Sequence, residues 1–184
     1  LLAHHVDESQ SRFMGFGVSA AAGLADDDLA PGDVVNRFRI ERVIGTGGMG
    51  IVYLAEQTAP VCRKVALKIV RVGMDTKELL ARFEAERQAL ALMDHPAIAR
   101  IYDAGVTERG RPFFAMEFVD GVPITEYCGT RRLDVPSRLR IFVDVCNAIQ
   151  HAHQRGIIHR DIKPNNVLVA EYEGKPAPKV IDFG

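Results

Sequence analysis

The sequence predicts an α+β protein in which an antiparallel β-sheet comes first and a mainly helical part follows. Four short runs are rich in β-branched and aromatic residues and are bounded by Gly, Pro or polar clusters, as is typical of strands with short connections: residues 38–44, 51–55, 65–70 and 113–119. Two longer stretches have helical periodicity, one between the third and fourth runs and one at about 136–154. The length of 184 residues is sufficient for one domain with a sizeable core.

The charge balance and the cysteines exclude several classes of protein. The chain has 23 Lys and Arg against 24 Asp and Glu, a net charge of -1, so nothing indicates a nucleic-acid partner or a polybasic membrane anchor. Its cysteines are Cys62, Cys128 and Cys146. They are odd in number, widely spaced and form no C-x-x-C pair, which argues against a disulfide framework and against a zinc site. We therefore expect a reduced, cytoplasmic setting.

No apolar run reaches the roughly 18 residues of a membrane helix, and the N-terminal region lacks the pattern of a signal peptide. The chain begins with Leu1 rather than Met, and it stops at Gly184 directly after a strand-like run. We expect a piece of a longer protein. The absence of a membrane segment therefore applies to this piece only, and the parent protein could be anchored elsewhere.

Residues 1–33 mix Ala, Gly, Ser and acids, and we expect a flexible lead-in. The run Gly45-Thr46-Gly47-Gly48-Met49-Gly50 then satisfies G-x-G-x-x-G between two strand-like runs. A dinucleotide-binding fingerprint would open a helix, whereas strand-like residues follow Gly50, so the glycines predict a hairpin tip. Such a tip lets backbone N–H groups approach a polyphosphate. A merely glycine-rich hairpin is the alternative.

Lys68 and Glu86 each interrupt an apolar pattern. Both faces of the strand at 65–70 are apolar, and a lysine there needs a partner unless it reaches solvent at an edge. On the following helix, Glu86 is the one carboxylate in an apolar stripe, which is costly to bury unpaired. We expect an ion pair between them. The alternative for Glu86 is a tolerated boundary position.

The second helix is predicted to have Leu139, Phe142, Cys146, Ile149 and His153 near one face, and Gly156 ends it. The stretch that follows holds Asp161, Lys163 and Asn166 on a turn between two apolar runs, 157–158 and 167–169, which we expect to be stubs of buried strand. A carboxylate, an ammonium and an amide so held can take a proton, steady an anion and hold a metal ion.

These pieces occur in the order found in one family. The chain resembles the eukaryotic-type protein kinases, most closely the bacterial serine/threonine ones. Five motifs carry the resemblance, and it covers residues 34–184: the glycine loop Gly45 to Val52, the strand lysine in Val65-Ala66-Leu67-Lys68, the helix residue Glu86, the loop His159-Arg160-Asp161-Ile162-Lys163-Pro164-Asn165-Asn166, and Asp182-Phe183-Gly184.

The resemblance implies a two-lobe protein-kinase-like fold. Residues 34–120 would form the ATP-binding N-lobe, an antiparallel sheet with one key helix. Residues 121–184 would form the beginning of a mainly helical C-lobe, which contains the catalytic loop. The activation segment would be missing, so we expect the 184-residue piece to be inactive alone.

The resemblance also implies ATP and Mg²⁺ as cofactors and a protein Ser/Thr hydroxyl as acceptor. Lys68, paired to Glu86, would hold the α- and β-phosphates; Asp182 and Asn166 would bind magnesium; Asp161 would accept the hydroxyl proton; and Lys163 would neutralise charge on the moving phosphate. The nucleotide site would comprise Ile44, Gly45, Gly47, Gly48, Gly50, Val52, Ala66, the gatekeeper-like Met116, the backbone of Glu117 and Val119, and Leu168. His159 would be structural, in a stacked core with Phe183, Leu90 and Ile101.

Two other functions remain open. One is a nucleotide-binding pseudokinase or scaffold, which the intact Lys68, Asp161, Asn166 and Asp182 disfavour for the parent protein but which fits the piece alone better. The other is a small-molecule phosphotransferase with a similar core. The glycine loop and Lys163 disfavour this reading, because Asp-x-Lys-x-x-Asn is the pattern of the family's serine/threonine members.

Overall fold

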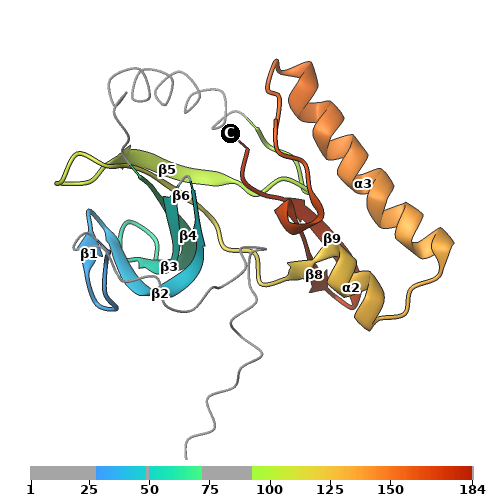
Figure 1. Cartoon of the computed structure of the whole chain (residues 1–184), viewed down its shortest axis with the longest axis horizontal. Coiled ribbons are helices and arrows are strands. Elements are labelled where there is room, and N and C mark those ends of the chain that lie inside the picture. The colour runs from blue at the N-terminus through green and yellow to red at the C-terminus, as the bar shows by residue number, and fades with distance from the viewer. Residues whose placement is uncertain (1–27, 49, 72–92, 184) are drawn as a thin grey trace, which may run out of the picture.

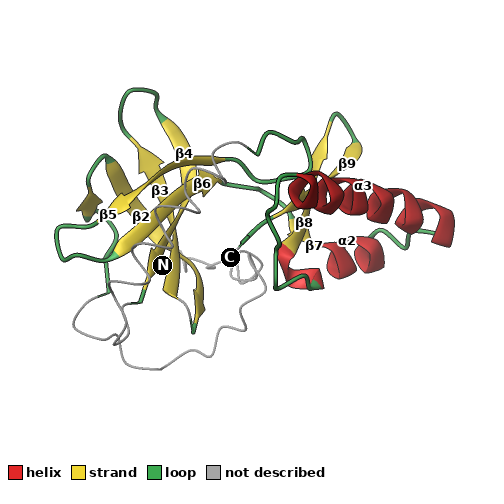
Figure 2. Ribbon diagram, turned by 90° about the horizontal axis from the view of Figure 1, so that it is seen from above, coloured by secondary structure: helices red, strands yellow, loops and turns green. Residues whose placement is uncertain are grey.

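The computed structural model describes residues 28–48, 50–71 and 93–183. It contains two antiparallel sheets, with two helices packed beside the second (Figures 1 and 2). The helix predicted between the third and fourth strand-like runs, with Glu86 and Leu90 on it, lies outside the described residues.

The first sheet has six strands in the order β1-β2-β3-β4-β6-β5, and all of its neighbouring strands are antiparallel. Its strands are β1 (Val34–Val35), β2 (Phe38–Gly47), β3 (Gly50–Gln57), β4 (Arg63–Val70), β5 (Ile101–Val106) and β6 (Pro112–Glu117). The four predicted strand-like runs therefore correspond to β2, β3, β4 and β6. The predicted antiparallel sheet is confirmed, and β1 and β5 were not anticipated.

The second part of the chain contains a three-stranded sheet of order β7-β8-β9. Its elements are β7 (Val122–Pro123), α2 (Ile124–Thr130), α3 (Val135–Gln154), a 3₁₀ turn (Pro164–Asn166), β8 (Val167–Tyr172) and β9 (Lys175–Val180). The helix α3 packs on β9 (Figure 1). The side chain of Asp134 caps this helix by accepting from the backbone N–H of Ser137 at 3.0 Å, which satisfies one of the free donors of the first turn.

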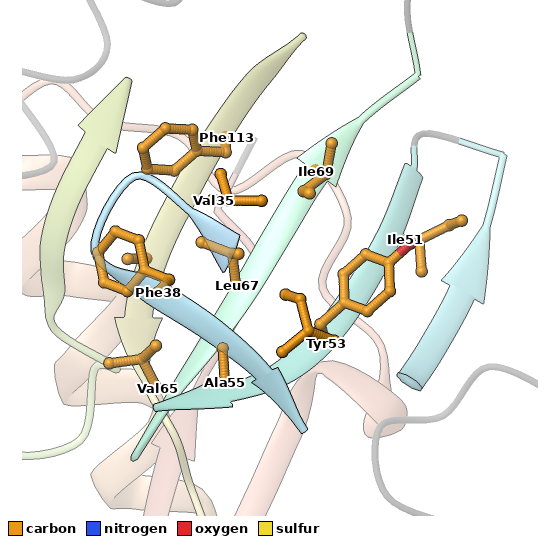
Figure 3. Packing of buried hydrophobic residues seen from close by; sticks show 11 residues of the cluster. Val35, Phe38, Ile51, Tyr53, Ala55, Val65, Leu67, Ile69 and Phe113 are labelled. Atoms are coloured by element: carbon orange, nitrogen blue, oxygen red, sulfur yellow. The ribbon is translucent and has the colours of Figure 1, made fainter. Parts of the chain in front are cut away.

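Alternation along the strands gives the first sheet two different apolar faces. On β4, Val65, Leu67 and Ile69 point into one buried cluster, whereas Ala66 lies in another cluster on the opposite face. Figure 3 shows the first cluster, in which the rings of Phe38 and Phe113 meet edge to face with centroids 5.8 Å apart. Lys68 follows the alternation of Ala66 and therefore lies on the face that contains the second cluster.

The segment before Val34 is attached to this sheet where the structure describes it. Leu29 packs against the first cluster, and its backbone N–H donates to the hydroxyl of Tyr53 at 3.2 Å. The backbone of Gly32 and Asp33 also pairs with Ile40. The rest of the predicted lead-in, residues 1–27, lies outside the described part.

Two predictions about the second part of the chain are wrong in detail. The face of α3 that faces the core consists of Ile141, Val145, Ala148 and Ala152. The predicted face is largely on the other side: Leu139 and Phe142 are 56% and 55% exposed. The apolar run at 157–158 is not a strand, and Ile158 is 63% exposed, whereas the run at 167–169 begins β8 as expected.

Candidate active site

The loop between α3 and the 3₁₀ turn is anchored by a buried histidine. His159 is 1% exposed, and its Nε2 donates to the backbone carbonyl of Ile181 at 2.9 Å. Its Nδ1 accepts from the backbone N–H of Asp161 at 3.3 Å, so one neutral tautomer satisfies both contacts. The His159 ring also contacts the ring of Phe183, with centroids 4.5 Å apart. His159 therefore fixes the backbone of Asp161 against the segment after β9.

The side chain of Asp161 is held by two donors on the same loop. Lys163 Nζ donates to Asp161 Oδ2 at 2.7 Å, and Asn166 Nδ2 donates to the same oxygen at 3.1 Å and to the Asp161 carbonyl at 2.9 Å. The hydrogen bond from Lys163 holds the pKa of the Asp161 carboxyl below its ordinary value, with smaller contributions from the charge of Lys163 and from Asn166. Asp161 is therefore an ionised, half-exposed carboxylate at neutral pH.

Asn166 has a free ligand atom in this arrangement. It is 2% exposed, and its Nδ2 is used by the two contacts with Asp161. Among the described residues, no partner occupies its Oδ1. The amide oxygen of Asn166 is thus available to a hard cation such as Mg²⁺.

Lys68 and Asp182 form an ion pair that joins the two parts of the fold. Lys68 lies on β4, and its Nζ donates to Asp182 Oδ1. The two side chains are only 14% and 19% exposed, so the pair is largely shielded from water. Asp182 has a φ of 63°, an unfavourable region for a residue other than glycine, and such strain concentrates at functional sites.

The structure thus gives Lys68 a partner, as its place in an apolar strand predicts, but that partner is Asp182. The predicted pairing with Glu86 lies outside the described residues. The sequence gives little signal for this contact, because 114 positions separate the two residues.

The residues expected to hold the adenine ring are brought together next to this ion pair. One buried cluster contains Ile44, Val52, Ala66, Met116, Val119 and Leu168, and Ile181 also belongs to it although the sequence did not indicate it. The cluster draws on β2, β3, β4, β6 and the segment after it, β8, and the segment after β9. It therefore lies where the two parts of the chain meet.

The glycine loop is a hairpin tip, as predicted. Gly45 lies opposite Val52, and Gly47 lies opposite Gly50. Gly50 has a φ of 156°, and a Cβ built on it would lie 2.1 Å from the carbonyl oxygen of Ile69, so only glycine fits there. A Cβ on Gly48 would meet nothing within 4 Å. The tip thus combines one obligatory glycine with one that leaves open space.

Glu117 has a side-chain role that the sequence did not indicate. Its carboxylate pairs with Lys179 on β9, with Oε1 2.8 Å from Nζ, and it also accepts from the backbone N–H of Arg100 at 3.2 Å. Only the backbone of Glu117 had been assigned to the nucleotide site.

The oxygen ligands present suit magnesium bound mainly through a nucleotide. Asp182 supplies a carboxylate and Asn166 an amide oxygen, the hard ligands that Mg²⁺ prefers. Within the part of the chain that the structure describes, no group of three His, Cys, Asp or Glu is arranged to hold a metal. This set fits Mg²⁺, which is usually held by one or two protein ligands together with substrate phosphates.

The family of the chain follows from comparison with known proteins. The protein kinase domain family matches residues 38–184, and the chain therefore belongs to the protein kinases. This confirms the family and the fold class predicted from the five motifs.

The curated relatives that the chain matches are bacterial serine/threonine-protein kinases. The chain is 41% identical over 149 residues to serine/threonine-protein kinase Pkn1 of Myxococcus xanthus, covering 80% of this chain and 21% of that protein. It is 42% identical over 153 residues to PrkC of Bacillus subtilis, covering 82% and 23%. With PknB of Mycobacterium tuberculosis it shares 36% identity over 159 residues, covering 84% and 25%.

A solved structure of the Mycobacterium tuberculosis PknI kinase domain superposes with a TM-score of 0.72 at 33% identity, covering 85% of this chain and 63% of that one.

The chain spans at most about a quarter of the length of the curated relatives named above. None of the helices that the structure describes has the length and apolar character needed to span a membrane.

Proposed function

We propose that this chain forms the ATP-binding and catalytic-loop portion of a serine/threonine protein kinase. The observation that carries the proposal is the environment of Asp161, whose ionised carboxylate is held by Lys163 and Asn166 and remains half exposed. A carboxylate so placed is a proton acceptor for an incoming hydroxyl.

In the proposed reaction, the substrate hydroxyl gives its proton to the Asp161 carboxylate. The hydroxyl oxygen forms a bond to the γ-phosphorus, the bond from that phosphorus to the β-phosphate oxygen breaks, and ADP leaves with the electron pair. Lys163 lies beside the same carboxylate oxygen and would neutralise negative charge on the transferring group.

Lys68 would bind the nucleotide's phosphates, and Asp182 would bind its metal ion. The ammonium of Lys68 suits the α- and β-phosphates, and the carboxylate of Asp182, with Asn166 Oδ1, suits magnesium. Bound Mg²⁺ would neutralise charge on the phosphate oxygens. In the proposed site, Glu86 would pair with Lys68 when the phosphates are bound.

The apolar cluster would hold the adenine ring. Val52, Ala66 and Leu168 would pack on its faces, Ile44 and the gatekeeper-like Met116 would line the site, and the backbone of Glu117 and Val119 would hydrogen-bond to its edge. The glycines Gly45, Gly47, Gly48 and Gly50 would cover the phosphates. Residues 34–120 would thus act as the nucleotide-binding lobe, and residues 121–184 would supply the catalytic loop.

The test is a transfer assay on the full-length protein, since the chain covers only part of its relatives. The protein is incubated with γ-labelled ATP, Mg²⁺ and a Ser/Thr-rich acceptor protein, and the labelled residues are identified after hydrolysis. We expect phosphoserine or phosphothreonine. Tight MgATP binding without transfer to the acceptor or to the protein itself would favour a nucleotide-binding module, and label on tyrosine alone would contradict the assigned substrate class.

A further inference from the structure

Four consecutive residues at the end of β9 each contact a different part of the molecule. Lys179 pairs with Glu117, and the backbone of Val180 bonds to Ala97 and Ala99. The carbonyl of Ile181 accepts from His159, and Asp182 pairs with Lys68. Residues 179–182 therefore join the segment before β5, the end of β6, the catalytic loop and β4.

The pair between Lys179 and Glu117 is well built. Lys179 Nζ lies 2.8 Å from Oε1 and 2.9 Å from Oε2 of Glu117, and the two side chains are 19% and 24% exposed. Glu117 is fixed further, because its backbone N–H donates to the Arg100 carbonyl at 2.8 Å and its carboxylate accepts from the Arg100 N–H at 3.2 Å. A shielded pair in which one partner is already fixed loses less side-chain entropy when it forms.

The position of this pair connects the two ends of the proposed nucleotide site. Glu117 ends β6 in the first sheet, and its backbone belongs to the proposed adenine edge. Lys179 is on β9 in the second sheet, three residues before Asp182. The pair thus links the backbone that would hold the base to the strand that leads to the carboxylate that would hold the metal.

We propose that Lys179 and Glu117 act as positioning residues for ATP binding, by holding the strand that leads to Asp182 at a fixed separation from the adenine edge. This inference rests on the proposed kinase function. Neither side chain contacts the nucleotide in this proposal. Both act through the adenine-edge backbone and Asp182, which would contact it. Breaking the pair should therefore weaken the binding only of a ligand that reaches both ends of the site.

The experiment compares two ligands of different reach on the full-length protein. MgATP spans the adenine edge and the metal residues, whereas adenosine lacks the phosphates. For Lys179→Met and for Glu117→Gln, we expect the KM for MgATP to rise by about fivefold or more, with kcat changed by less than about threefold and the Kd of adenosine within about twofold of the original.

Three further variants separate the pair from a general loss of structure. The double variant Lys179→Met with Glu117→Gln should weaken MgATP binding no more than either single change, because both remove the same contact. Lys179→Arg keeps the charge and should recover most of the affinity. Lys175→Met is the matched control, because Lys175 lies on the same strand and is exposed, and it should leave the KM unchanged.

A KM for MgATP within about twofold of the original in both single variants would overturn the proposal. An equal loss of adenosine and MgATP binding would overturn it as well, because that result indicates a structural role. The unmutated protein decides the separate question of function: if it transfers no phosphate, the kinase assignment fails first, whereas normal transfer with insensitive variants refutes the positioning role alone.

Discussion

Lys68 lies on β4 and Asp182 follows β9, and the two side chains neutralise each other in a site shielded from water. Each is therefore available to a ligand that carries both an anion and a cation, as ATP with magnesium does. Asp161 is different, because Lys163 and Asn166 already hold its carboxylate and it remains open to solvent on the catalytic loop. The two sets of charges thus suit binding and proton transfer respectively.

Replacing Lys68 by Met in the full-length protein should weaken productive nucleotide binding. Hydrogen bonds to charged groups contribute about 1.5–3 kcal/mol, so we expect roughly tenfold to hundredfold weaker MgATP binding, measured by calorimetry, and slower transfer. Lys64→Met is the control, because Lys64 lies on the same strand with a side chain that is 61% exposed. An unchanged affinity and rate would mean that Lys68 only extends to solvent.

For single residues, the sequence predicted which ones are unusual better than it predicted their contacts. Because both faces of the strand around Lys68 are apolar, this lysine was predicted to need a partner. The loop motif placed Asp161, Lys163 and Asn166 together. The contact between Lys179 and Glu117 could not be foreseen, because a lysine in a proline-rich strand is usually solvated and nothing local reveals its distant partner.

Among the elements, the hairpin of β2 and β3 depends on the close approach of Gly50 to the backbone of β4. Gly50 lies opposite Val70 of β4, so a side chain there meets the backbone of the neighbouring strand. Gly48 faces open space. The two glycines of one motif therefore have different physical roles.

Gly50→Ala should lower the free energy of unfolding by about 1–3 kcal/mol, because the new Cβ forces the strands apart and the backbone is strained. Gly48→Ala, at the same tip, should stay within about 0.5 kcal/mol of the original protein. Chemical denaturation without nucleotide measures both. Equal effects would show that the tip does not approach β4 as described.

The segment between residues 93 and 99 packs against α3 and β9, and its His95 contacts His151 of α3. The rings of His95 and His151 are 4.9 Å apart, and His95 Nδ1 accepts from the Ala97 N–H at 3.1 Å. Burial lowers the pKa of His95; the charges of His151, Lys179 and Arg155 lower it further, and Asp144 raises it.

This pKa predicts a stability that depends on pH. Since the folded state favours the neutral ring, the unfolded chain binds more protons between the folded-state pKa and about 6.5. Stability should therefore fall as the pH drops below about 6.5, until the pH passes the folded-state pKa. NMR titration of the His95 ring measures the shift directly. His151→Gln should raise the pKa of His95, His153→Gln should not, and a value for His95 at or above 6.5 would contradict this account.

The helix α3 shows where element-level prediction failed. Its sequence has apolar residues around most of its circumference, so periodicity could not tell which face meets β9. The buried face of α3 is the one that contains the small residues Ala148 and Ala152, which lets the helix approach the sheet closely. Phe142 and Leu139 lie on the exposed side.

In the molecule as a whole, residues 179–182 connect the two sheets, because Lys179 pairs with Glu117 of β6 and Asp182 pairs with Lys68 of β4. The antiparallel first sheet and the motif order were predictable, because strand alternation and motif spacing are local. Of the small second sheet only the start of β8 was predicted, because β7 is two residues long and β9 carries two prolines. The solved PknI kinase domain extends beyond the region matched here, since the match covers 63% of it.

The most direct test of the central claim is Asp161→Asn in the full-length protein. The amide keeps the shape of the side chain but cannot take the hydroxyl proton, so phosphoryl transfer should fall by at least about a hundredfold while MgATP still binds. Asp144→Asn, an exposed change on α3, serves as the control and should transfer phosphate at the original rate. Full residual transfer by Asp161→Asn, measured with saturating MgATP, would contradict the assignment of Asp161 as the catalytic base.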